Sequence, residues 1–295
     1  MEINMNLLII LVLCLLAAIK VLTQSRFAKG NTKCIADSSF FVGTVFATMS
    51  VLAFALSPER ELNAALLLGA ACFGIFNVSF QMIYQIALSC GPTSITALIA
   101  SLASIIPISV SAIVYKEPLT VLNLIGVVLI IATLVLNADI KRDTGAKNEV
   151  GRKWFLLVIL AFFANSMGIL SQQIYAKATG AASSFTFIAC SSGIASVIAF
   201  LLCAVLHLRG NRLSYTVTPK KMLPGVAVGV ILAVFQIMYT NAMSSIPGTV
   251  LFPTYSGGST IVIALGSRLV FGEKLTRAQQ MSLIVGIVAI VFINV

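Results

Sequence analysis

Amide and phenol side chains recur at helical spacing inside a long apolar stretch, residues 63–88. Asn77, Gln81 and Gln85 follow one another at four-residue intervals, and Tyr84 lies beside them. Residues four apart share one face of a helix. An amide exposed to hydrocarbon is costly unless it is hydrogen-bonded. This face therefore predicts a polar interior surface that can hydrogen-bond a ligand, since amides and phenols both donate and accept.

A second apolar stretch, residues 222–243, repeats this arrangement. Gln236, Tyr239 and Thr240 occupy the equivalent face, and Gln236 and Tyr239 match Gln81 and Tyr84 at one constant offset. The recurrence of the same residue types at the same place favours a cavity formed jointly by the two stretches.

Lys20 is the one charged residue well inside an apolar stretch, and Gln24 lies on the same helical face. If a helix covers residues 6–29, Lys20 lies less than one turn from its centre. One interpretation is a lysine whose long stem reaches the membrane interface. The other is a cationic contact for a carboxylate or phosphate on a substrate. In residues 154–175, Asn165 and Gln172 occupy the matching face.

Serines repeat on one side of residues 94–115 and again in residues 249–270. Small residues at this spacing usually let helices pack closely, and cavity lining is the alternative. The serines and the glycine at the matching position are Ser101, Ser104 and Ser111, and then Ser256, Ser259 and Gly266.

The groups needed for bond-breaking chemistry are missing from the apolar stretches. The chain has one histidine, His207, at a predicted helix end, and its six cysteines include no C-x-x-C pair. Asp37, Glu117 and Glu273 also fall at helix ends, where an acid stabilises the start of a following helix. We therefore expect no catalytic residues, no metal site and no cofactor. The chain is not expected to be an enzyme.

Composition places these residues in a membrane. Hydrophobic residues make up 59% of the 295 residues and charged residues only 9%, which is too little polar surface to cover a soluble protein. A spanning helix needs about 20 mostly apolar residues. The chain is therefore predicted to be an all-α integral membrane protein with ten transmembrane helices. The predicted helices are 6–29, 38–56, 63–88, 94–115, 120–138, 154–175, 183–206, 222–243, 249–270 and 277–294.

Two halves of this helix set resemble each other. Four short matches occur in the same order on corresponding helices, including 23–29 with 171–177 and Lys116–Thr120 with Gly272–Thr276. They predict a five-helix unit over 6–138, a polar linker over 139–153 and a second five-helix unit over 154–295. Because five is odd, the second unit must cross the membrane in the opposite direction, as in inverted-repeat transporters.

Basic residues predict the orientation. Sixteen of the 19 lysines and arginines lie in or next to the loops after odd-numbered helices, and the loops after even-numbered helices hold only Arg60, Lys116 and Lys177. Basic loops stay in the cytoplasm. The odd-numbered loops are therefore predicted to be cytoplasmic, in a multi-pass protein of the plasma membrane.

The turns Lys116–Thr120 and Gly272–Thr276, together with Pro107 and Gly126, resemble the EamA-like branch of the drug/metabolite transporter superfamily. The resemblance implies a central cavity between two repeats and alternating access. It also implies a small polar metabolite as substrate, such as an amino acid, an amine, or a nucleoside or sugar derivative. The residues predicted to bind it are Lys20, Gln24, Asn77, Gln81, Tyr84, Asn165, Gln172, Gln236 and Tyr239.

Two other functions stay open at this point. A membrane sensor or scaffold without transport is one, and an intramembrane lipid-modifying enzyme is the other. The expected partners are the lipid bilayer and a small-molecule substrate. Nucleic acid is not expected, because the net charge of +10 is confined to short loops. Monomer and homodimer both remain open.

The charge distribution predicts opposite sides of the membrane for Asn211 and Asn63. In a variant whose native cysteines are replaced, Asn211→Cys should be protected from an impermeant thiol reagent added outside whole cells, and Asn63→Cys should be labelled. Labelling of Asn211→Cys with protection of Asn63→Cys would contradict the orientation.

Overall fold

The computed structural model describes residues 2–58, 62–91, 102–117, 148–211 and 213–272, with isolated residues between 93 and 100, 121 and 129, and 281 and 288. These residues are helical apart from short turns, with no strand among them. Seven of the described helices are long and apolar enough to cross a membrane. The elements are α1 (Glu2–Asn31), α2 (Ile35–Ala55), α3 (Ala64–Cys90), η1 (Leu102–Ser104), α5 (Ile105–Ile113), α7 (Asn148–Thr179), α8 (Ser184–Leu208), α9 (Pro219–Ser245) and α10 (Gly248–Phe271).

The apolar stretches predicted the described helices to within a few residues at most ends. One difference concerns α7, which begins at Asn148, inside the predicted linker. The predicted helices 120–138 and 277–294, the linker residues 139–147 and the turn residue Glu273 lie largely or wholly outside the described residues.

The predicted helix 94–115 changes form at η1, a short 3-10 turn directly before α5. Pro107 explains the change, because it has no backbone N–H and its ring crowds the carbonyl four residues earlier. That carbonyl, Ala103 O, accepts a hydrogen bond from the Ser166 hydroxyl of α7 at 3.0 Å instead.

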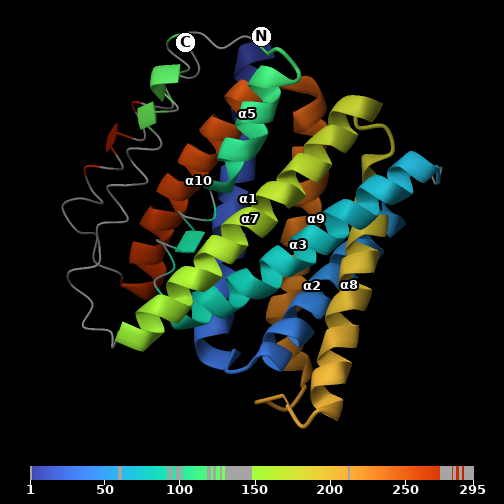
Figure 1. The fold of residues 1–295 in the computed structure, drawn as a ribbon, viewed down its shortest axis with the longest axis vertical. Helices are drawn as coiled ribbons and strands as arrows, with labels where there is room; N and C mark the ends of the chain where they lie inside the picture. Colours follow the sequence, from blue (N-terminus) through green and yellow to red (C-terminus); the bar gives the residue numbers. More distant parts are fainter. Residues whose placement is uncertain are drawn as a thin grey trace.

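Two helix pairs form the main contacts between the halves of the chain, α2 with α8 and α3 with α7 (Figure 1). α1 lies against both α9 and α10. The α2–α8 pair is held by reciprocal hydrogen bonds, because Ser50 Oγ donates to Ala189 O at 2.8 Å and Ser196 Oγ donates to Gly43 O at 3.2 Å. Small residues thus bring backbones together, as is usual where lipid supplies no hydrophobic drive for helices to associate.

The outer faces are apolar. On α1, exposed side chains recur three or four residues apart, so they form one stripe along the helix. This stripe consists of Leu8, Leu11, Leu15 and Ile19, each about half exposed. A water-soluble chain of this size would bury such a stripe, whereas lipid accommodates it.

Two glycines mark places where the backbones of helices from different halves approach closely. A Cβ at Gly74 of α3 would lie 2.5 Å from Ser191 O of α8, and a Cβ at Gly229 of α9 would lie 2.6 Å from Val45 O of α2. Both contacts are with backbone, so the neighbour cannot rotate away.

Gly74→Ala and Gly229→Ala should each destabilise the protein, by about 1–3 kcal/mol, because the added methyl group forces the helices apart. Gly30→Ala is the matched control, since no atom lies within 4 Å of a Cβ at that position. Thermal unfolding in detergent measures the effect. Unfolding temperatures of the two variants equal to that of Gly30→Ala would show that the approaches are not tight.

Candidate functional site

A pocket with a volume of about 110 Å³ lies among α1, α3, α7, α9, α10 and the segment 97–104. Its volume is several times that needed for one buried water. Eight of the nine residues that the sequence predicted to bind substrate line it. They are Lys20, Asn77, Gln81, Tyr84, Asn165, Gln172, Gln236 and Tyr239. The ninth, Gln24, is bonded to Gln81. Binding of substrate by these residues stays a prediction.

The glutamines form two pairs at the pocket. Gln24 Nε2 donates to Gln81 Oε1 at 3.3 Å, joining α1 to α3. Gln172 Nε2 donates to Gln236 Oε1 at 3.0 Å, joining α7 to α9. All four side chains are more than nine-tenths buried. Each pair satisfies amide groups that would otherwise be costly in an apolar interior.

Not every polar atom of this layer is satisfied. Within the described part of the chain, Gln24 Oε1 and the Tyr239 hydroxyl have no hydrogen-bond partner. Asn165, in contrast, uses its side-chain amide to donate to Ala100 O at 2.9 Å. Unpaired buried polar groups beside a pocket are candidates for ligand contacts.

Lys20 lines the pocket from α1. Its Nζ lies 6.0 Å from the centre of the Phe80 ring and 5.9 Å from that of the Tyr84 ring. These distances fall at the outer limit of cation–π attraction. The structure thus places Lys20 at the pocket, and a cationic contact with a substrate stays a prediction.

Aromatic side chains form a large part of the pocket wall, and the sequence pattern singled out only Tyr84 and Tyr239 among them. Phe80 and Tyr84 have ring centres 5.1 Å apart, and Tyr239 and Tyr255 have ring centres 5.0 Å apart. The other two aromatic residues of the lining are Phe73 and Phe235. The spacing of Phe73 and Phe80 relative to Asn77 and Gln81 is a signal that could have identified them.

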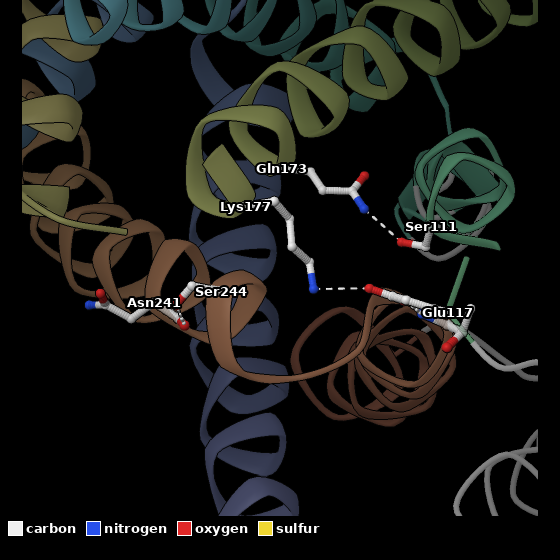
Figure 2. Close-up of polar contacts among 7 residues, drawn as sticks. Ser111, Glu117, Gln173, Lys177, Asn241 and Ser244 are labelled. Carbon is white, nitrogen blue, oxygen red and sulfur yellow. Dashed lines mark hydrogen bonds and ion pairs between the residues drawn. The ribbon is translucent and has the colours of Figure 1, made fainter. Parts of the chain in front are cut away.

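The repeated serines both pack helices and border the pocket. Ser104 Oγ donates to Ser256 Oγ at 3.1 Å, and both residues line the pocket together with Ser259. Ser111 lies away from it and accepts a hydrogen bond from Gln173 Nε2 at 2.6 Å (Figure 2). Ser101 lies outside the described residues.

Glu117 holds three elements together near the end of α5 (Figure 2). Its Oε1 lies 2.9 Å from Nζ of Lys177 on α7, and its Oε2 accepts a hydrogen bond from Thr249 N at 3.0 Å. Thr249 lies in the first turn of α10, so the acid stabilises that helix N-terminus. Glu117 was predicted to stabilise a helix N-terminus, and the helix that it contacts is α10. The predicted cap at Thr120 lies outside the described residues.

The turn before Glu117 is sharp. Lys116 has φ 51°, and Gly272, at the matching position of the second half, has φ 65°.

Asp37 lies in the first turn of α2, directly after α1. It accepts hydrogen bonds from Cys34 N and from the backbone and hydroxyl of Ser214, the latter at 2.6 Å. No aspartate or glutamate is among the residues that line the pocket. Within the described ranges, no three histidine, cysteine, aspartate or glutamate residues are grouped to hold a metal ion.

Comparison with known proteins agrees with this architecture. Residues 4–138 match the sequence model of the EamA-like transporter family. The resemblance predicted from the turns is confirmed, because the first half of the chain is similar to this family of the drug/metabolite transporter superfamily. The described helices agree with a multi-pass membrane protein.

A solved structure titled "Crystal structure of protein" superposes with a TM-score of 0.72 at 14% sequence identity. The superposition covers 98% of this chain and 96% of that chain, so the two share their fold. In all, 28 chains of solved structures match. A search of curated proteins finds no match.

Lys177→Met and Glu117→Gln should each lower the unfolding temperature, because each leaves one partner of a largely buried ion pair alone. In a double-mutant cycle, the coupling energy should be about 0.5–3 kcal/mol. The side chains are 21% and 10% exposed, so solvent screening favours the lower part of this range. Additive effects of the two substitutions would show that the pair contributes nothing to stability.

Proposed function

We propose that the chain is a secondary transporter that carries a small polar metabolite across the plasma membrane by alternating access. The observation that carries the proposal is the central pocket, which takes its lining from both halves of the chain. Substrate sites of such transporters lie where two repeats meet.

The proposed architecture is ten transmembrane helices in two inverted five-helix repeats, 6–138 and 154–295, joined by the segment 139–153. Contacts between described helices support it, because exchanging the halves maps one pair onto another. The contact of α3 with α8 corresponds to that of α9 with α2, and the contact of α3 with α7 to that of α9 with α1. The pair α1–α3 likewise corresponds to α7–α9.

Individual residues follow the same exchange. Gln24 with Gln81 corresponds to Gln172 with Gln236, and each pair is hydrogen-bonded with the first residue donating. Gly74 corresponds to Gly229, and each meets a backbone carbonyl of the other half's second helix. Two halves with equivalent internal contacts have two ways to pack that are related by exchanging the halves about a pseudo-two-fold axis, and these two packings are what alternating access requires.

The proposed orientation places the loops after odd-numbered helices in the cytoplasm. Contacts between loops support this grouping. Asp37 follows the first predicted helix and Ser214 follows the seventh, and the two are hydrogen-bonded, so these two odd-numbered loops lie together. Glu117 and Lys177, after the fourth and sixth predicted helices, meet each other. The expected partners are the bilayer and the substrate, with the oligomeric state left open.

The rival functions account for less of the molecule. A sensor or scaffold has no evident need for matched halves around a polar pocket. A lipid-modifying enzyme needs a base, a nucleophile or a metal at its site, whereas the pocket offers amides, phenols and a lysine.

Accessibility of the pocket from both faces of the membrane tests the proposal. In a variant whose native cysteines are replaced, Ser259→Cys should react with an impermeant methanethiosulfonate in right-side-out vesicles and also in inverted vesicles. Leu11→Cys is the control, because Leu11 is 54% exposed on the apolar outer face and lipid should shield it from both sides. Reaction from one side only, or from neither, would contradict alternating access.

A further inference from the structure

We propose that the pocket selects aromatic monocarboxylates and rejects the amino acids that carry the same ring. This inference rests on the proposed transport function and names the substrate class for its site. Three features of the pocket carry it: a cation with no acidic partner among the described residues, an aromatic wall, and a described lining that includes no acid.

The first feature is the charge of Lys20. Of the carboxylates that the structure describes, Asp37 is bonded to Ser214 and its own loop, and Glu117 is paired with Lys177. Lys20 thus faces the pocket without an acidic partner from the described residues. A cation in a low-dielectric interior gains from an anion, and a substrate carboxylate supplies one.

The second feature is the wall on which a flat ring can stack. Phe80 and Tyr84 of α3 lie beside Lys20, while Phe235, Tyr239 and Tyr255 of the second half form a cluster with ring centres 5.0–5.6 Å apart. Aromatic rings favour offset or edge-to-face contact with another ring beyond their gain from area burial. A planar ring therefore fits this wall better than a saturated one.

The third feature decides against an amino acid. A substrate ammonium would lose its hydration and needs a carboxylate or several free acceptors. Gln81 Oε1 and Gln236 Oε1 already accept from Gln24 and Gln172. Gln24 Oε1 has no partner among the described residues, but one neutral acceptor does not replace the hydration of an ammonium. The positive charge of Lys20 also disfavours a second cation. The free Tyr239 hydroxyl, by contrast, can donate to a carboxylate oxygen.

Four matched probes separate these features. We suggest calorimetric titration of the purified full chain in detergent with 3-phenylpropionate, 3-cyclohexylpropionate, 3-phenylpropionamide and phenylalanine. 3-Phenylpropionate should bind, and each of the others should bind about tenfold more weakly or worse. Equal binding of the cyclohexyl probe would overturn the role of the aromatic wall. Equal binding of the amide would overturn the role of Lys20, and equal or tighter binding of phenylalanine would overturn the discrimination against an ammonium.

Variants link the binding to the pocket. Lys20→Met should weaken 3-phenylpropionate binding by about 10- to 100-fold, the range for a charge-assisted hydrogen bond, and should leave amide binding unchanged. Lys33→Met, which removes an exposed lysine, should have no effect. Tyr239→Phe should weaken carboxylate binding by about three- to tenfold.

Absence of binding by all four probes would overturn the proposed substrate class. The two-sided labelling of Ser259→Cys does not depend on any ligand, so it would still decide whether the protein is a transporter. The two proposals can therefore fail separately.

Discussion

The need to pair buried amides in a membrane interior organises this molecule. Lipid offers no hydrogen bonds, so a glutamine on a spanning helix must find its partner within the protein. Gln24 and Gln81 satisfy each other, and so do Gln172 and Gln236. Each pair joins the first helix of its half to the third. The position of the pocket follows, because its polar lining lies where these pairs meet the aromatic residues.

A second constraint governs the packing of the helices. In lipid, helices gain little from the hydrophobic effect when they associate. The contacts between halves therefore use short distances and single polar bonds. Gly74 and Gly229 bring backbones together, and Ser50 and Ser196 donate to carbonyls of the facing helix. Pro107 contributes in another way, because it leaves Ala103 O free to accept from Ser166 across the interface.

Helices and the polar face of the pocket could be predicted from sequence because both depend on periodicity within one segment. The hydrogen-bond partners of these residues could not be predicted, because the periodicity of a sequence shows which residues share a helix face but not which other helix that face contacts. The contact of Lys177 with Glu117 joins residues 60 positions apart along the chain and was not predicted. The aromatic wall was missed for a related reason, because Phe73, Phe80 and Phe235 satisfy the same apolar pattern as ordinary core residues.

The location of the polar contacts, within one half or between the two, affects how easily the halves can move relative to each other. Both glutamine pairs lie within one half each, so under the proposed mechanism the halves can shift without unpairing these four amides. Two of the contacts that cross between halves are of a kind that water can replace. The Lys177–Glu117 pair is partly exposed, and water can hydrate both charges when it opens. Ser104 and Ser256 meet at the pocket itself, where a polar ligand or water can replace either hydroxyl. A molecule that keeps these glutamine pairs inside each half, and whose halves meet in part at contacts that water can replace, can change its packing at lower cost than one that must unpair them, as a transporter must.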